Sequence, residues 1–292
     1  RSTTPCWLPT RSAARAKATN FFVAFLMRAD RPPNITADEI DSLPAQSFLG
    51  SAEYHARLDS TNARSALLVA GRDPITFPHL VYAEQQTAGR GRQGKDWFSA
   101  PGSLTFSLIV SREALGLSRE QLPLTALATG IAVLQTGLHF LPQGDFGLKW
   151  PNDVFLAGKK VAGILLEVSQ VPDAVVIGIG VNVNNDFDRF PAAVAQQSVA
   201  VHSIAETPID RFAFLLHLLG RLERQLADVA AGQSISGAWN QYCLLSGRTV
   251  TLELADRQLR GCCRGIDASG RLLLDEAGTV TAFATGEVCN WQ

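Results

Sequence analysis

The chain has little net charge and no long apolar run. Its 26 Lys and Arg residues balance 27 Asp and Glu residues, which leaves a formal net charge of -1 over 292 residues. A near-neutral chain lacks the broad basic surface of many nucleic-acid-binding proteins, so we expect any anion binding to be local. No apolar run approaches the roughly 20 residues of a membrane-spanning helix. These absences argue against DNA and membrane as partners.

Cysteine is scarce and forms no recognisable framework. The five cysteines are odd in number, none follows Cys-x-x-Cys spacing, and Cys262 and Cys263 are adjacent. Such a set is a poor disulfide pattern and a poor metal site. Reduced thiols and a cytoplasmic location are therefore predicted.

The first 50 residues are the least domain-like part of the chain. No acidic residue precedes Asp30, whereas basic, Ser, Thr and Ala residues are frequent. This composition is typical of a transit-type leader. The single methionine is Met27, so the stretch can equally be sequence upstream of the true start. We predict a poorly ordered N-terminal extension over residues 1–50, without a helix-turn-helix pattern.

Hydrophobic periodicity from residue 51 onward predicts an α+β protein of two domains. Residues 51–245 combine short apolar strands with two amphipathic helices, at 119–140 and 208–231. Strands that follow one another through turns indicate a mixed, mostly antiparallel sheet. Residues 246–292 contain short strands and tight turns, which predict a small β-barrel.

A Gly/Arg segment is the strongest local signal. Residues 89–94 read Gly-Arg-Gly-Arg-Gln-Gly and follow the strand-like run at residues 79–83. Glycine lets backbone N–H groups approach a ligand, and arginine offers a planar set of donors to phosphate or carboxylate. The segment predicts an anion site, although a surface turn with arginines on its rim has the same composition.

Three other features of the sequence accompany the Gly/Arg segment. Asp59-Ser60-Thr61-Asn62 is a helix N-cap cluster, which can also hold a small polar ligand. Residues 146–154 form a strand that Pro-Asn-Asp at 151–153 should bend. Glycines at 163, 178 and 180 weaken two later strands, so close approach of a ligand or another backbone is expected there.

Taken together, four segments resemble the biotin protein ligases, enzymes that attach biotin to carboxylase and related carrier proteins. They are residues 59–62 (DSTN), 86–94 (QTAGRGRQG) with Trp97 after them, 149–153 (KWPND) followed by 159–165 (KKVAGIL), and 178–184 (GIGVNVN). The resemblance covers about residues 51–290.

The resemblance implies a fold and a reaction. The fold is a catalytic domain similar to lipoate ligases and class II synthetases, followed by an SH3-like barrel. The reaction joins biotin to ATP as biotinyl-5′-adenylate and then transfers biotin to a lysine of a carrier protein. ATP and Mg²⁺ are implied, with the biotin carboxyl carrier domain of acetyl-CoA carboxylase or a related carboxylase as partner; a homodimer is one option.

The resemblance also assigns residues. Lys160 and Arg92 are the implied catalytic side chains. The implied biotin contacts are Ser60, Thr61, Asn62, Gln86, Arg90, Gly91, Arg92, Lys160 and Gly163. The implied nucleotide contacts are Arg90, Lys95, Trp97, Lys149, Asn152 and Asn182, with Asp153 as a Mg²⁺ ligand. Trp97 can instead anchor the loop, and Asn152 and Asp153 can simply form a turn.

Two departures and two alternatives remain at this point. Lys95 stands where many bacterial members carry arginine, so the charge is kept but bidentate geometry is lost. No DNA-binding domain is expected, hence no repressor function. A lipoate ligase or octanoyl transferase shares the fold and the acyl chemistry. A non-catalytic regulator that senses biotin-adenylate is the alternative of another class.

Overall fold

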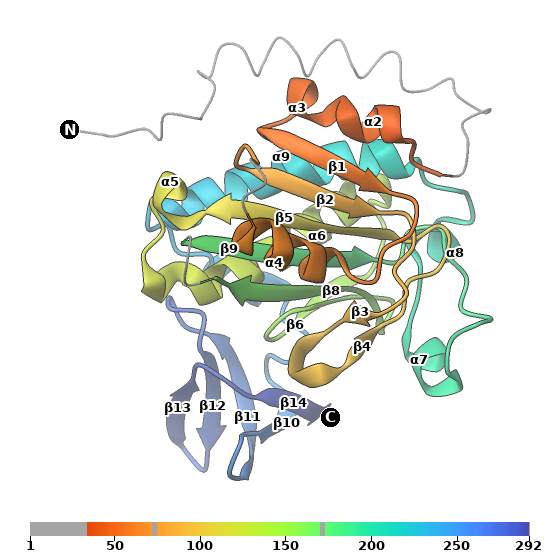
Figure 1. Cartoon of the computed structure of the whole chain (residues 1–292). Coiled ribbons are helices and arrows are strands. Elements are labelled where there is room, and N and C mark those ends of the chain that lie inside the picture. Colours follow the sequence, from red (N-terminus) through yellow and green to blue (C-terminus); the bar gives the residue numbers. More distant parts are fainter. Residues whose placement is uncertain (1–33, 72–74, 170–172, 292) are drawn as a thin grey trace.

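A seven-stranded mixed sheet forms the larger domain (Figure 1). The structure is a computed structural model that describes residues 34–71, 75–169 and 173–291. In sheet order the strands are β1 (Ser51–His55), β2 (His79–Ala83), β5 (Leu104–Ser111), β9 (Ala174–Val181), β8 (Lys159–Val168), β7 (Asp153–Leu156) and β6 (Phe146–Lys149). Only the β1–β2 pair of this sheet is parallel. The prediction of a mostly antiparallel sheet is confirmed.

Helices cover both faces of this sheet. Helix α6 (Leu122–Phe140) packs on β6, β7 and β8, and α9 (Arg211–Ala230) packs on α6. Helix α4 (Thr61–Ala70) lies on the opposite face, against β2, β5 and β9. The shorter helices are α5 (Arg112–Leu115), η3 (Arg119–Gln121), α7 (Ala192–Gln197), α8 (Val201–Ala205) and α10 (Ser236–Gln241). The face under α4 is only partly covered, which leaves room for a site.

The segment Arg119–Phe140 corrects one expectation from the sequence. By length and mean hydropathy it could cross a membrane, although no such run was predicted. Its most apolar window is 72% buried within the protein. The helix is apolar nearly all round because the sheet lies on one side of it and α9 on another. It is a core helix of this domain.

Residues 34–50 also differ from the prediction. They form α2 (Ala37–Asp41) and α3 (Leu43–Gln46), with a capping box between Thr36 and Glu39. Ile40 and Leu43 are fully buried in the main core. The ordered domain therefore begins before residue 51, because these two apolar side chains cover the edge of the sheet at β1. The predictions for residues 1–33 lie outside the described residues.

The C-terminal domain is a five-stranded antiparallel sheet. Its strands, in sheet order, are β13 (Thr279–Phe283), β12 (Leu272–Glu276), β11 (Gln258–Ile266), β10 (Thr249–Glu253) and β14 (Glu287–Trp291). Within the described residues no pairing joins β13 to β14, so the expected closed barrel is not seen. The last strand was not predicted. The indole N–H of Trp150 donates to the carbonyl of Gly270 (3.0 Å), which ties this sheet to the larger domain.

A buried charge cluster holds the strand ends beside the uncovered face. Arg211, at the start of α9, donates to Glu84 (2.6 Å) and to the carbonyl of Ser103 (2.8 Å). The Tyr82 hydroxyl donates to the same carboxylate (2.6 Å). Arg211 and Glu84 are 3% and 8% exposed, so this is an ion pair out of water. It joins α9 to the end of β2 and the start of β5.

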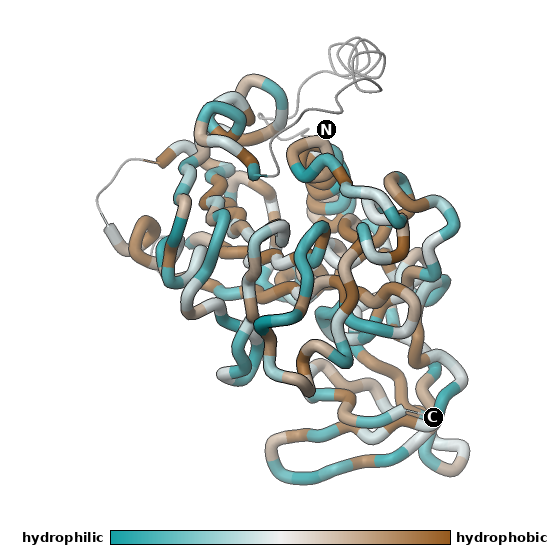
Figure 2. Tube along the Cα trace, turned by 90° about the vertical axis from the view of Figure 1, so that its right-hand side faces the viewer, coloured by the Kyte–Doolittle hydropathy of each residue, from teal (hydrophilic) through white to brown (hydrophobic). Residues whose placement is uncertain are grey.

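Hydropathy follows the same layering. In the view of Figure 2, hydrophobic segments run through the interior of the larger domain, while hydrophilic segments lie on stretches that face the viewer and in peripheral loops. The uncovered face of the sheet is an exception with many polar groups, and the candidate site lies there.

Candidate active site

Strand register creates the floor of one cavity. On this face Ser107 of β5 pairs with Gly178 of β9, which pairs with Leu165 of β8. In the adjacent row, Thr105 pairs with Gly180, then Gly163, then Asp153. Cross-strand partners point to the same face, so glycines occupy the middle of both rows. The two rows form a shallow floor on which other side chains can lie.

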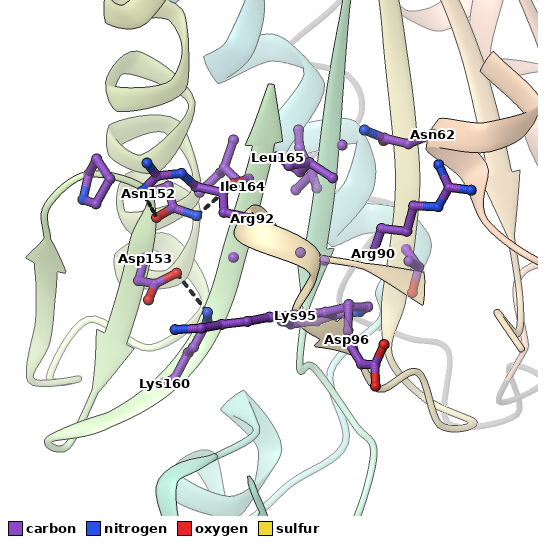
Figure 3. Close-up of a pocket in the computed structure, with 18 of the residues that line it drawn as sticks. Asn62, Arg90, Arg92, Lys95, Asp96, Asn152, Asp153, Lys160, Ile164 and Leu165 are labelled. Atoms are coloured by element: carbon purple, nitrogen blue, oxygen red, sulfur yellow. Dashed lines mark hydrogen bonds and ion pairs between the residues drawn. The ribbon is translucent and has the colours of Figure 1, made fainter. Parts of the chain in front are cut away.

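Motifs that are far apart in the sequence surround this floor. The lining residues are Ser60, Thr61, Asn62, Gln86, Arg90, Gly91, Arg92, Lys95, Asp96, Trp97, Thr105, Lys149, Trp150, Pro151, Asn152, Asp153, Lys160, Gly163, Ile164, Leu165, Gly178, Ile179, Gly180, Glu287 and Val288. In Figure 3 Arg92, Asn152, Asp153 and Lys160 gather along one side of the cavity, and Arg90 and Asn62 lie on the other.

The N-terminus of α4 supplies one polar end. Ser60 caps the helix by accepting from the Ala63 N–H (3.4 Å). The Gln86 side-chain oxygen accepts from the Thr61 N–H (2.7 Å) and from the Thr61 hydroxyl (3.0 Å). The helix start is thus joined to the chain just before the Gly/Arg segment. Both the N-cap and the ligand-holding interpretations fit this geometry.

Asn62 lies directly on a glycine of the floor. A Cβ on Gly178 would come within 2.2 Å of the Asn62 side-chain oxygen. That oxygen accepts from the Ser107 hydroxyl (2.6 Å), and the amide nitrogen donates to Glu167 (2.7 Å). The sequence predicted that a ligand or another backbone would approach this strand glycine; in the structure a side chain, that of Asn62, lies there instead.

The Gly/Arg segment folds as a short hairpin over the cavity. Strands β3 (Gly89–Arg90) and β4 (Asp96–Trp97) pair across the 3-10 turn η2 (Arg92–Gly94). The indole of Trp97 lies against Gly180, where a Cβ would come within 2.3 Å of the ring, and near Gly163 at 3.4 Å. Its N–H is buried without a hydrogen-bond partner among the described residues. Trp97 therefore anchors the hairpin on the cavity floor.

Arg92 and the bent strand meet on the far side of the cavity. The Arg92 guanidinium donates to the Asn152 side-chain oxygen (3.3 Å), and the Asn152 amide donates to the Ile164 carbonyl (2.8 Å). The sequence predicted one strand over residues 146–154 bent at Pro-Asn-Asp; instead, Pro151 and Asn152 form the turn of an antiparallel hairpin between β6 and β7. Through Asn152, this turn holds the Arg92 guanidinium beside the cavity floor.

Two lysines and one carboxylate complete this cationic side. The Lys160 ammonium lies 2.7 Å from Asp153. The Lys149 ammonium lies 4.4 Å from the centre of the Trp291 ring, a cation–π contact. Burial lowers the pKa of Lys149, with Lys160 adding to that effect and Asp153 opposing it. The cavity therefore has one end at α4 that is rich in hydroxyl and amide groups, with Arg90 and Glu167 beside them, and a cationic end at the 149–160 hairpin.

Sequence comparison identifies the family. Residues 55–184 match the Biotin/lipoate A/B protein ligase family, and residues 245–289 match the Biotin protein ligase C terminal domain. The biotin--[acetyl-CoA-carboxylase] ligase of Mycobacterium tuberculosis is 34% identical over 237 residues, which are 80% of this chain and 86% of the relative. This chain belongs to the biotin protein ligase family.

One further relative and one solved structure are also similar to this chain. The bifunctional ligase/repressor BirA of Bacillus subtilis is 32% identical over 227 residues, which are 76% of this chain and 68% of that protein. The solved biotin protein ligase from Aquifex aeolicus in complex with biotin and ATP is 28% identical, with a TM-score of 0.71. That match covers 84% of this chain and 99% of the other.

The site residues predicted from the sequence of this biotin protein ligase family member lie together around the cavity, with one exception. All of them line the cavity except Asn182. The Asn182 side-chain oxygen accepts from Asn185 (3.2 Å), and its backbone bonds to Val161 and Val201. Asn182 does not line the cavity. Strand β9 ends at Val181, just before it, and the backbone of Asn182 bonds instead to Val161 and to Val201 at the start of α8.

Glu287 and Val288 were missed by the sequence reasoning. Both belong to β14 of the C-terminal domain, and Glu287 forms an ion pair with Lys95 of the hairpin. Lys95 and Glu287 are 192 positions apart in the sequence, and no motif links them. Lys95 therefore binds a carboxylate with a single point charge, a task that does not require the bidentate geometry of arginine.

Proposed function

We propose that this protein is an ATP-dependent biotin protein ligase, which makes biotinyl-5′-adenylate and transfers biotin to a lysine of a carrier protein. The observation that best supports this proposal is that four motifs, far apart in the sequence, surround one cavity with a polar end and a cationic end. Family membership supports the same activity. Biotin has a polar ureido ring and a carboxylate at opposite ends, so its two ends match the two ends of this cavity.

The first step joins the biotin carboxylate to the α-phosphate. A carboxylate oxygen attacks the α-phosphorus of ATP; the new O–P bond forms as the bond to the pyrophosphate oxygen breaks, and pyrophosphate leaves. Two anions must approach each other, so nearby cations lower the barrier. Lys160 and Arg92 are the proposed residues for this role, since both line the cationic side and Arg92 is oriented by Asn152.

The polar end is the proposed ureido subsite. Thr61, Asn62 and Gln86 are all at most 8% exposed, and their side chains are hydrogen-bonded to one another or to neighbours. A site built from oriented polar groups discriminates against an analogue that lacks matching groups, because its own buried groups would lose partners. This argues for biotin over lipoate, whose ring has no amide.

Asp153 is the proposed residue for Mg²⁺ that accompanies ATP. Mg²⁺ commonly takes only one or two protein carboxylates and completes its shell with water and phosphate oxygens. A single partly buried carboxylate beside the cationic residues fits that requirement. When bound, the ion would offset phosphate charge. Lys149, Asn152, Trp97 and Arg90 are the proposed contacts to the nucleotide.

In the second step the acceptor amine attacks the acyl carbon of the adenylate. The C–N bond forms, the bond from carbon to the phosphate oxygen breaks, AMP leaves, and the nitrogen loses a proton. We propose the biotin carboxyl carrier domain of acetyl-CoA carboxylase, or of a related carboxylase, as acceptor, in the cytoplasm. The hairpin at residues 89–97 would shield the adenylate from water before the acceptor arrives.

One assay tests this proposal. The purified protein is incubated with ATP, Mg²⁺, biotin and an apo carrier domain, and the acceptor is weighed by mass spectrometry. We expect one biotinyl group on one lysine, and none without ATP. A parallel reaction offers lipoate and its own apo acceptor. Transfer of lipoate alone would reject the biotin assignment and favour a lipoate ligase.

A further inference from the structure

We propose that Glu167 is a positioning residue for biotin, which acts by fixing the side-chain amide of Asn62. The inference rests on the proposed function, because Asn62 is taken there as part of the ureido subsite. Glu167 lies near the end of β8 and does not belong to any of the four motifs. It is separated from Asn62 by 105 positions in the sequence.

The sheet register places Glu167 on the cavity face. Gly163, Leu165 and Glu167 alternate along β8 and so point to one side. Leu165 pairs with Gly178, the glycine on which Asn62 lies, and Glu167 follows one step further along that face. From there its carboxylate accepts from the Asn62 amide nitrogen at 2.7 Å. The contact is a consequence of strand register, which is why no local pattern reveals it.

Of the two partners of Asn62, Glu167 rather than Ser107 determines which way the amide points. The Ser107 hydroxyl is 2.6 Å from the amide oxygen and also 2.7 Å from the Thr61 hydroxyl oxygen. Thr61 directs its own proton to Gln86, so the Ser107 proton is free to bond either neighbour. In a flipped amide the Asn62 oxygen would face the Glu167 carboxylate. Two acceptors would then oppose each other, so a carboxylate at position 167 allows one orientation.

Charge at position 167 is therefore more important than size. A glutamine there could donate as well as accept, and either orientation of Asn62 would find a partner. Glu167 is exposed, and it also borders the hollow beneath the Gly/Arg hairpin with Arg90 and Leu165. Replacing an exposed side chain removes no core packing, so an effect on biotin would not arise from loss of stability.

The test begins with Glu167→Gln in the full chain. We expect the KM for biotin to rise at least about twofold, because an Asn62 amide that takes both orientations leaves only about half of the molecules competent to bind, while kcat and the KM for ATP stay at the parent values. Calorimetric titration with biotin alone should weaken by the same factor. Glu276→Gln, on the β12 strand of the C-terminal domain, is the control for loss of one negative charge and should bind biotin like the parent.

A double-mutant cycle then asks whether Glu167 acts through Asn62. In the Asn62→Ala background, Glu167→Gln should have no additional effect on the KM for biotin. Additive effects would overturn the proposal, and so would an unchanged biotin affinity of Glu167→Gln on its own, a result independent of how Asn62→Ala folds. If the parent protein does not biotinylate a carrier at all, the proposed function fails instead, so the two failures are distinguishable.

Discussion

At the scale of single residues, glycines on the cavity floor decide where the aromatic and amide side chains can lie. Gly178 admits Asn62 and Gly180 admits Trp97, each at a distance that a Cβ would occupy. An alanine at either position should therefore displace the side chain that lies on it.

Gly180→Ala should displace Trp97 and the hairpin attached to it. The new methyl would lie within 2.3 Å of the indole, so the ring has to move out of its place. We expect kcat/KM for biotin to fall by about tenfold to a hundredfold, since small misplacements of positioning groups have effects of this size. Steady-state kinetics measure it, together with limited proteolysis between residues 90 and 95.

Gly220→Ala is the matched control for this change. Gly220 is inside α9 with nothing within 4 Å of its Cβ position. Alanine there should keep full activity and raise stability by up to about 1 kcal/mol, because glycine is a poor helix former. Full activity of Gly180→Ala with an unchanged cleavage rate would contradict the role given to Trp97.

Lys160→Ala should slow adenylate formation. Removing a cation from beside the reacting anions is expected to lower the rate by about a hundredfold to a thousandfold. Pyrophosphate release with biotin and ATP measures this step directly. Lys159→Ala changes an exposed neighbour on the same strand and should have no effect. Equal rates for the parent and Lys160→Ala would remove this lysine from the site.

At the scale of elements, the buried Arg211–Glu84 pair joins α9 to the ends of β2 and β5 that frame the cavity. Arg211→Ala leaves the Glu84 carboxylate buried beside Tyr82 without its cation. Breaking such a pair on one side typically costs about 3–5 kcal/mol. We expect a loss of that size in the free energy of unfolding, measured by urea denaturation.

An exposed ion pair provides the comparison. Arg264 bonds to Asp275 (2.7 Å) across β11 and β12, and the Arg264 side chain is 54% exposed. Arg264→Ala should cost less than about 1 kcal/mol. If both variants lost the same small amount, the structural importance assigned to the buried pair would be wrong.

At the scale of the whole molecule, stability should depend on pH through the contact between the two long helices. His139 of α6 and His217 of α9 are stacked, with ring centres 4.1 Å apart. Burial lowers the pKa of His217 to about 4, and the nearby His139, Arg221 and Arg224 add to this. Burial also lowers the pKa of His139, and Arg221 adds to that shift.

The sign of the pH effect follows from proton uptake. An unfolded histidine binds a proton below about pH 6.5, whereas folded His217 resists protonation until about pH 4. This contribution is therefore complete above about pH 6.5 and is lost as the pH falls toward 4. We expect a loss of about 1–2 kcal/mol from this residue, after allowance for solvent around a half-buried ring.

Thermal unfolding between pH 7 and pH 4.5 measures the effect. His217→Gln cannot take up a proton, so its stability should fall less steeply with acid than that of the parent. Identical slopes for the two proteins would show that the stacked pair does not control acid stability.

The sequence by itself determined the local elements and the chemical character of the site. Helical and strand periodicity depend on neighbours a few residues apart, so the two long helices and most sheet strands could be predicted, whereas β7 could not, since residues 146–154 were predicted as one bent strand. Motifs such as Ser60–Asn62 and Lys149–Asp153 carry their chemistry in contiguous residues, and they line the cavity as expected.

Only the tertiary structure decided which of these residues meet. The Asn62–Glu167 and Lys95–Glu287 contacts join positions 105 and 192 apart, and they arise from strand register and from the docking of the C-terminal sheet. Asn182 belongs to the matching motif at residues 178–184 but is held away from the cavity by its own hydrogen bonds. Register and docking are set by burial summed over the whole core, so no single segment of the chain contains that information.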